Sequence, residues 1–404
     1  MTGLVGKISN RLAFLCGWRN SRPLDLRNDW GSLRAELADQ GLYKHAKITK
    51  LTNLSKLILI ASFGMAFSDA HAFSRPSGVP NLFEDGPQYT AQQYLLGNSC
   101  YSLRASPIDL ECNPAFLAQS RKTAFQFSIW GTDQVLAVYD YYGQLNADDS
   151  LGVVDTLLNE RGPLLAKASA SFWYQNEWWA VGVVPARGGF AYLNRNPAFP
   201  EISTIAFREW ELFGKVGLFT AADENFQVGL QSRFVQREYV YQQFYADDVF
   251  ADPSLLPIRN QSTLYLEPGF AYEWDSSLRP TLAGMVRNIS LFQTGDQLPS
   301  RPIFEIGFSS GLGHSLQGFR GTTHYSTQAP DDQFFRGFSW SGMYEFSENF
   351  NSSITLGQNL FGFGANCKLW FATLGGSFKS QDVMIDNWTK ANVSTFALDL
   401  GAEF

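Results

Sequence analysis

Few residues of this 404-residue sequence combine types and spacing that suit covalent chemistry. Past residue 72 the chain has two histidines, His314 and His324. A serine nucleophile must lie within hydrogen-bond reach of its base, but the adjacent His314 and Ser315 would point to opposite faces of a strand. The segment from Gly337 to Gly342 has the wrong spacing for a Gly-x-Ser-x-Gly motif. We therefore predict no catalytic, cofactor-binding or metal-binding site, and no enzymatic activity.

Two cysteines are close enough in sequence to form a disulfide. Cys100 and Cys112 enclose a short loop, and no histidine or second cysteine pair accompanies them as a zinc site would require. In an oxidising compartment we expect them to be bridged, which would remove roughly 3 kcal/mol of unfolded-chain entropy. Cys367 lies on an expected strand and is interpreted as a small apolar residue.

Charged residues that recur on one face of alternating segments are the remaining candidates for a functional surface. Inside a β-barrel these side chains would face the lumen, where they could form ion pairs that fill and solvate the interior, or line a path for a solute; both interpretations stay open. The lumen-lining candidates are Glu209, Glu211, Lys215, Arg233, Arg237, Glu267, Arg279, Arg287 and Glu305.

The elements that would position these residues are strands. From Leu164 to the end, apolar and polar residues alternate between turn-forming residues, as on Glu209 to Leu218. Charged residues are 17% and aromatic residues 15% of the chain, yet no run of 18 apolar residues occurs, which argues against a helical membrane protein. A soluble β-sandwich also alternates, but it would need several domains, and no linker follows residue 122. The pattern favours a transmembrane barrel.

We count fourteen segments, with twelve and sixteen as the alternatives, and an even number suits a bacterial barrel. The fold class is all-β, a single antiparallel transmembrane β-barrel with an N-terminal plug-like segment. Residues 133–163 interrupt the pattern, and apolar spacing from Ser150 to Gly162 predicts a helical insertion between the first two strands. The strands are expected near 123–131, 164–176, 178–190, 202–221, 225–240, 262–274, 278–289, 302–312, 315–325, 334–346, 349–360, 361–369, 371–379 and 394–404.

The last segment carries its own signal. Phe396, Leu398, Leu400 and the terminal Phe404 share one face of an amphipathic strand. A final strand that ends in an aromatic residue resembles the signal read by the barrel-assembly machinery of the outer membrane. We therefore interpret these four residues as an assembly signal.

The N-terminal part resembles an export signal. Four lysines (Lys44, Lys47, Lys50 and Lys56) precede the apolar run Leu57–Phe67, and Ala70 and Ala72 form an A-x-A site before Phe73. We expect residues 1–72 to be an extension plus signal peptide cleaved after Ala72, 73–122 a periplasmic or plug-like segment, and 123–404 the barrel. Because the signal lies far inside the chain, either its basic region is unusually long or translation starts at a non-Met codon near residues 42–51; we favour the second. The exported part carries 21 basic and 33 acidic residues, a balance that argues against nucleic acid as a partner.

Several short motifs resemble one family of barrels. Asn113-Pro114-Ala115-Phe116-Leu117-Ala118 resembles the element that opens barrels of the conjugal-transfer TraF-like family, which is similar to FadL fatty-acid transporters and PorV-type secretion barrels. Further motifs with this resemblance are Gly162-Pro163-Leu164-Leu165-Ala166, Pro268-Gly269-Phe270-Ala271-Tyr272, Gly284-Met285-Val286-Arg287-Asn288 and Gly362-Phe363-Gly364-Ala365-Asn366. The family usually carries Gly-rich and Asp-Asp elements before the first motif, where this chain has Ser106-Pro107-Ile108-Asp109 and the cysteine pair.

The resemblance implies a function and a location. We expect a barrel in the outer membrane of a Gram-negative bacterium, a FadL-like passive channel or transporter for small solutes, hydrophobic ones among them, without a cofactor. The expected partners are outer-membrane lipid, the barrel-assembly machinery and periplasmic proteins. The alternative is a non-transporting structural barrel, or one associated with secretion or conjugation, that docks periplasmic partners. A soluble secreted β-protein is the remaining class.

Overall fold

A computed structural model describes eleven stretches of the chain: 88–105, 109–119, 123–135, 164–194, 201–220, 225–245, 258–295, 302–311, 318–328, 334–384 and 390–404. The expected signal peptide, the expected helix after Ser150 and His314 lie outside these residues. In the described part, no helix is long and apolar enough to cross a membrane.

The described residues form fifteen strands. Long runs of period-two alternation produce strands because β-branched and aromatic residues pack well on a pleated surface. The strands are β1 (Ala124–Thr132), β2 (Leu164–Gln175), β3 (Trp179–Asn194), β4 (Glu201–Thr220), β5 (Phe226–Tyr245), β6 (Arg259–Glu273), β7 (Thr281–Arg287), β8 (Ile289–Gly295), β9 (Ile303–Gly311), β10 (Gly318–Ser326), β11 (Phe338–Ser347), β12 (Phe350–Gly357), β13 (Leu360–Leu369), β14 (Ala372–Met384) and β15 (Lys390–Glu403).

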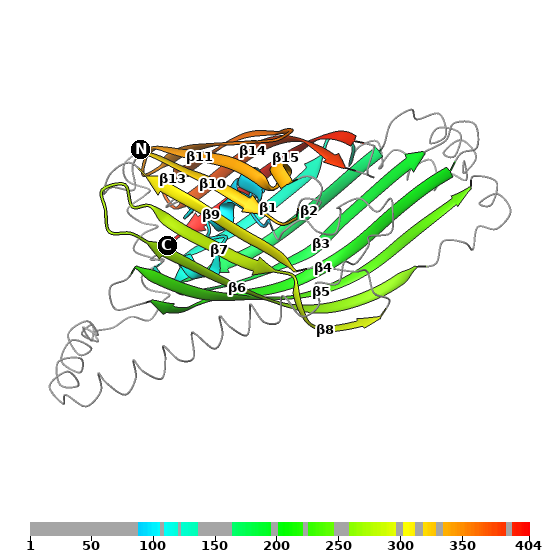
Figure 1. Cartoon of the computed structure of the whole chain (residues 1–404), viewed down its shortest axis with the longest axis horizontal. Helices are drawn as coiled ribbons and strands as arrows, with labels where there is room; N and C mark the ends of the chain where they lie inside the picture. The colour runs from blue at the N-terminus through cyan, green and yellow to red at the C-terminus, as the bar shows by residue number, and fades with distance from the viewer. Residues whose placement is uncertain are drawn as a thin grey trace, which may run out of the picture. The chain divides into compact units, whose positions relative to one another are not determined.

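Fourteen of these strands close into one antiparallel barrel, as the alternation predicted. Each pairs with its sequence neighbour, apart from the step from β7 to β9. The first and last strands close the ring, with Phe125 opposite Ala402 and Phe127 opposite Leu400, and β5 pairs with β6. Closure leaves no free sheet edge in the ring, which a lipid environment requires. Figure 1 shows the long strands β3 to β6 side by side along one wall.

The fifteenth strand, β8, is the main departure from the expected layout. One strand was expected near 278–289, but β7 ends at Arg287, and Asn288 has φ 59, a left-handed conformation that asparagine adopts more readily than most residues. β8 then continues along β6, with Leu264 opposite Phe292. Within the described residues β9 pairs with β7 and β10 but not with β8, so β8 separates from the next strand of the ring.

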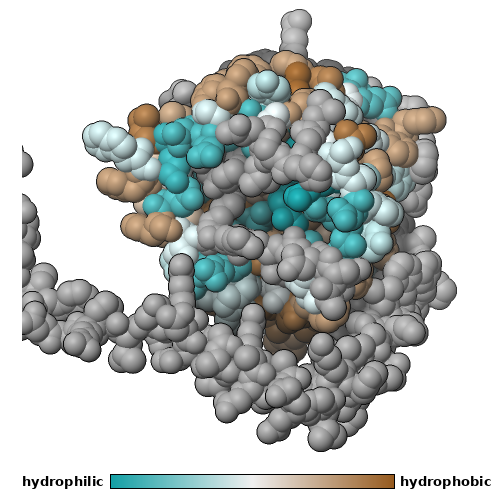
Figure 2. Space-filling view, turned by 90° about the vertical axis from the view of Figure 1, so that its left-hand side faces the viewer, coloured by the Kyte–Doolittle hydropathy of each residue, from teal (hydrophilic) through white to brown (hydrophobic). Residues whose placement is uncertain are grey.

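The two faces of the wall differ in polarity. On β4, Glu209, Glu211 and Lys215 point inward and are buried, whereas Trp210 and Leu212 point outward and are 39% and 49% exposed. Figure 2 looks at one end of the barrel and shows hydrophobic residues around the outside and hydrophilic ones in the hollow middle. Apolar outside and polar inside is the pattern of a barrel that faces lipid.

Aromatic residues gather at the end of the barrel that carries the short turns. Trp178, Trp274, Phe346 and Phe371 lie there and are at least 40% exposed, and Trp370 is 93% exposed at the tip of the β13–β14 turn. Aromatic side chains at this position match the girdle that transmembrane barrels place at the membrane–water interface. The chain ends at the same side, where the backbone N–H of Phe404 donates to the carbonyl of Thr123 over 2.9 Å.

The outward face of β15 provides a test of this surface. Leu398 is 61% exposed near the middle of the strand, and an arginine there should destabilise a lipid-inserted barrel by about 2–4 kcal/mol because the charge meets hydrocarbon. The free energy of unfolding in lipid vesicles should fall for Leu398→Arg and stay near wild type for Ser276→Arg, in an exposed turn. Equal stabilities for the two variants would contradict a lipid-facing wall.

Candidate functional site

The lumen contains a folded stretch of the chain, which we call the inner segment (described residues 88–105 and 109–119). It comprises the helix α4 (Ala91–Leu96) and the 3-10 helices η2 (Gly97–Tyr101) and η3 (Pro114–Gln119). Thr90 caps α4, because its hydroxyl oxygen accepts a 3.0 Å hydrogen bond from the Gln93 N–H. Most of these residues are buried, polar ones such as Gln92, Gln93 and Asn113 included, so the segment is enclosed by the wall.

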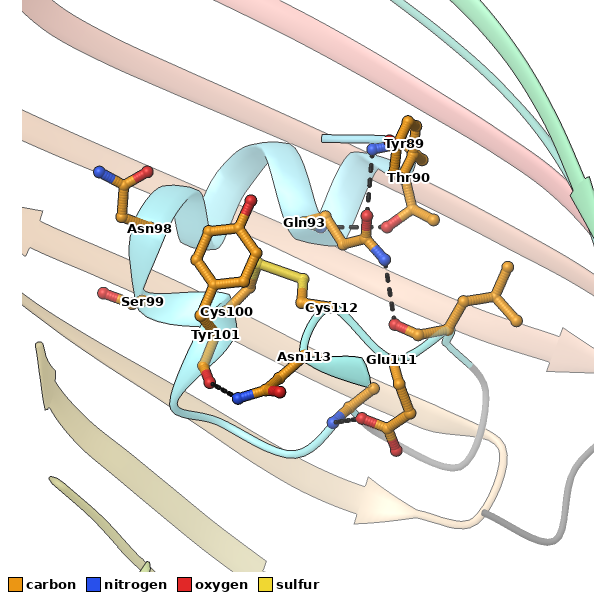
Figure 3. The surroundings of a disulfide bond; sticks show 12 residues. Tyr89, Thr90, Gln93, Asn98, Ser99, Cys100, Tyr101, Glu111, Cys112 and Asn113 are labelled. Atoms are coloured by element: carbon orange, nitrogen blue, oxygen red, sulfur yellow. Dashed lines mark hydrogen bonds between the residues drawn. A yellow bond between two sulfur atoms is a disulfide. The ribbon is translucent and has the colours of Figure 1, made fainter. Parts of the chain in front are cut away.

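The predicted disulfide is confirmed and joins the two halves of the inner segment. Cys100 at η2 and Cys112 before η3 are bonded, with 5.7 Å between their Cα atoms. Figure 3 shows the disulfide between the helical turn that holds Cys100 and the extended backbone before η3. Beside it, the Asn113 side-chain amide donates to the Tyr101 carbonyl. The crosslink therefore holds the two halves of the segment together.

The first half docks on one side of the wall. The Ala91 N–H lies 2.8 and 2.7 Å from the two carboxylate oxygens of Asp399 on β15. Leu95 lies against β13, where a Cβ added to Gly362 or Gly364 would come within 2.6 or 2.8 Å of the leucine methyls. The inward glycines of β13 thus make the room that α4 needs.

The second half docks on a different part of the ring. At Gly229 of β5 an added Cβ would lie 2.2 Å from the Pro114 carbonyl group, and at Gly269 of β6 it would lie 2.2 Å from the side-chain oxygen of Asn113. The Asn113 amide also donates to the carbonyl of Gly284 on β7 over 3.2 Å. The inner segment therefore crosses the lumen from β13–β15 to β5–β7.

These contacts bring together motifs that are far apart in the sequence. Asn113-Pro114 meets Pro268-Gly269-Phe270 and Gly284, while α4 meets Gly362 and Gly364. The Asn366 amide of the last motif donates to the Gln92 side chain. Their shared feature is contact with the inner segment, which the sequence alone did not indicate.

Polar contacts with β4 hold the inner segment at Tyr89, near its start, and at Glu111 and Cys112, just before η3. The Tyr89 hydroxyl donates to Glu211; burial, together with the Glu211 charge, raises the pKa of Tyr89 well above its usual value, so the phenol stays protonated. The Lys215 ammonium donates to the carbonyls of Glu111 and Cys112, each at 3.0 Å. It also lies 4.8 Å from the ring centre of Trp173, a cation–π distance.

Next to these contacts, three arginines and three glutamates form an alternating network across β3 to β6. Arg237 bonds Glu209 at 2.7 Å, Arg187 joins Glu209 and Glu211 at 2.8 and 3.3 Å, and Arg233 joins Glu211 and Glu267 at 3.4 and 2.7 Å. Each buried charge has an opposite neighbour, which burial requires. Arg187 was not among the predicted lumen residues, although it lies on an alternating segment.

A second cluster lies on β7, β9 and β10 against η2. Arg287 is ion-paired with Glu305, and the other Glu305 oxygen lies 2.8 Å from Nε2 of His324. Nδ1 of His324 is 3.0 Å from the Ser102 hydroxyl of the inner segment. This serine–histidine–glutamate chain was not foreseen, because Ser102 and His324 are 222 residues apart. All three side chains are buried and Arg287 neutralises the glutamate, so the chain ties the segment to the wall.

One predicted lumen residue lies elsewhere. Arg279 is in the turn between β6 and β7 with φ 40, its side chain is 51% exposed, and it pairs with Glu273 at 3.8 Å. The correction follows from where β7 begins: the strand starts at Thr281, so the alternation does not extend back to Arg279. The other eight predicted lumen residues point inward and are buried, and Phe396, Leu398, Leu400 and Phe404 are exposed on the outer side of β15 and its end.

Beyond the ion-pair network, away from the short turns, the inward face of β2 to β5 carries a group of apolar residues, with the buried Lys167 of β2 beside them. Leu165, Ala191 and Ile205 are directly opposite one another on β2, β3 and β4, and Phe207 on β4 pairs with Tyr239 on β5. All five are buried. Along this wall the lumen therefore changes from apolar to charged and then reaches the inner segment.

Comparisons with known proteins find distant structural likenesses. No family model and no curated protein matches the chain. Among solved structures, the CymD monoaromatic hydrocarbon channel is 10% identical with a TM-score of 0.48, and the alignment covers 78% of this chain and 97% of CymD. The toluene transporter TbuX of Ralstonia pickettii is 8% identical with a TM-score of 0.43 (72% and 92% covered), and the P. putida toluene transporter TodX is 9% identical with a TM-score of 0.33 (72% and 93%). At these identities the likeness concerns architecture, not activity.

Docking of the inner segment depends on the inward glycines. Gly229→Val should displace η3, since the new side chain would overlap Pro114 and overpacking typically costs ~1–3 kcal/mol. Limited proteolysis of the folded barrel should then cut the inner segment at least about tenfold faster than in wild type. Gly214→Val on the outward face of β4, where an added Cβ meets only open space and a carbonyl at 3.9 Å, is the matched control. A cleavage rate unchanged in Gly229→Val would contradict this docking.

The ion-pair network predicts a stability change. Glu267→Gln should lower the free energy of unfolding by about 3–5 kcal/mol, because it leaves the buried Arg233 with one remaining, more distant carboxylate. Glu238→Gln, at an exposed position of the neighbouring strand, should change it little. Denaturant titration in detergent compares the two, and a Glu267→Gln barrel as stable as the control would show that the network is not maintained.

Proposed function

We propose that the protein is a FadL-like outer-membrane barrel that lets small solutes, hydrophobic ones among them, cross the membrane passively. The observation that carries the proposal is the order of surfaces along the lumen: the apolar row of Leu165, Ala191 and Ile205, then the ion-pair network, then the inner segment. The row is buried, so a hydrophobic solute could leave water for this apolar surface only when the row becomes accessible. The proposal is compatible with the activity that the names of the hydrocarbon channels above describe, but it rests on the order of surfaces along the lumen.

In this proposal the inner segment is the plug of the channel. Its two halves contact different parts of the ring, and the disulfide links the halves to each other. A solute would pass only where contacts with the segment yield. The separation of β8 from β9 gives the wall beside the Arg233–Glu267 pair fewer backbone bonds than elsewhere, and this is where we place such movement.

The alternative, a non-transporting barrel that docks periplasmic partners, has an observation of its own. The charges near the inner segment are paired with one another rather than exposed to an open path, as in a sealed barrel. Membership of the TraF-like family would fit this alternative and rests on the short motifs alone. Lipid, the assembly machinery and periplasmic proteins remain proposed partners.

Transport is tested with the full-length exported protein in liposomes. Uptake of a small aromatic hydrocarbon should exceed that of protein-free liposomes, and single-channel recordings should show conductance. A barrel that is sealed in both assays would contradict transport and favour the docking alternative.

The plug is tested by removing its crosslink. Loss of the disulfide makes unfolding of the segment more favourable by roughly 3 kcal/mol, so Cys100→Ala with Cys112→Ala should raise conductance or the frequency of openings. Cys367→Ala, which removes the free cysteine of the outer wall, should leave both unchanged. Conductance identical in the double variant and wild type would argue against a plug.

A further inference from the structure

The outward wall over β10 to β15 contains a groove of about 690 Å³. Its floor is formed by Ser352, Ala365 and Gly376, which lie directly opposite one another on β12, β13 and β14. Tyr344 and Leu398 stand at the two ends of the same row. Elsewhere on this wall outward positions hold large side chains such as Phe361, so the groove is a local hollow in a bulky surface.

One side of the groove is a row of large side chains. Ile354, Phe363, Phe378 and Phe396 lie opposite one another on four neighbouring strands. The ring centres of Phe363 and Phe378 are 5.5 Å apart, and those of Phe378 and Phe396 are 5.2 Å apart. Because the rings pack on one another, they form a continuous side wall.

The width of the groove limits what can occupy it. Neighbouring outward positions on a strand are two residues apart, which is about 6.7 Å. The floor row is therefore flanked at that distance by the aromatic row and, on the other side, by Phe350, Cys367 and Leu374. The two flanking rows are thus about 13 Å apart at the backbone, and their own side chains narrow the space between them to less than the roughly 10–12 Å thickness of an α-helix with its side chains. One extended hydrocarbon chain fits there.

We propose that this groove binds one acyl chain of an outer-membrane lipid. No charged residue lines it, so the chain rather than the headgroup is recognised. An unfilled hollow would cost its lining atoms their dispersion contacts, and the rigid rings cannot close over it. The inference rests on the lipid-facing position of the wall and is independent of whether the barrel transports a solute.

Native mass spectrometry of the detergent-purified, delipidated barrel tests the proposal, with phospholipid as the probe. Wild type should retain one lipid per barrel. In Gly376→Phe, where an added Cβ meets only Leu398 at 3.7 Å and the ring would fill the groove, retention should fall at least about fivefold. Gly214→Phe, an outward glycine of β4 with similar open space, should retain lipid as wild type does.

A second variant, Ala365→Leu, places a smaller side chain on the floor of the groove and should also reduce retention of the phospholipid. Heat-modifiable electrophoretic mobility checks that each variant is folded. Equal retention in wild type and both groove variants would overturn the proposal. So would oxidative crosslinking of wild type through Cys367 into dimers that Gly376→Phe abolishes, since a second copy would then occupy the groove. Solute uptake should be the same in all variants, which separates this test from that of transport.

Discussion

The requirement that backbone N–H and C=O groups find partners inside the barrel wall governs the fourteen-strand ring, and β8 departs from it, since within the described residues it pairs with β6 alone. Hydrocarbon offers no hydrogen bonds, so strands in lipid must pair on both sides. The β1–β15 and β5–β6 pairs complete the ring, and β8 pairs outside the ring, along β6. Closure fixes the direction of each side chain, because alternate residues must then face either lipid or the lumen.

That division of the surface explains how the lumen is built. Inward glutamates and arginines cannot be solvated once the inner segment is in place, so they pair with one another, as Arg233 does with Glu267. The inner segment approaches the wall closely only where glycine replaces a side chain, as at Gly229 and Gly364. Its own buried polar groups, such as the Asn113 amide, bond wall carbonyls. Segment and wall therefore depend on each other for satisfied polar groups.

The sequence predicts the parts of this fold that follow local rules. Period-two alternation and turn residues located the strands, and on β4 they separated Glu209 from Trp210 correctly, because one face is covered and the other is not. Arg279 was wrongly predicted to face the lumen, because the alternating sequence pattern continues into the turn before β7, where the backbone is not extended and side chains no longer alternate between two faces. The meeting of Asn113 with Gly269, and of Ser102 with His324, could not be predicted. Both contacts arise only after distant strands close around the inner segment, and nothing in the local sequence encodes that approach.

Hydrogen–deuterium exchange of the protein in lipid tests the closed ring most directly. The account predicts slow exchange of backbone amides on all fourteen ring strands, including β5 and β6 at their shared seam and β1 and β15 at the junction of the chain ends, with faster exchange on β8. Fast exchange along β5 and β6, or along β1 and β15, would indicate an open sheet and contradict the account.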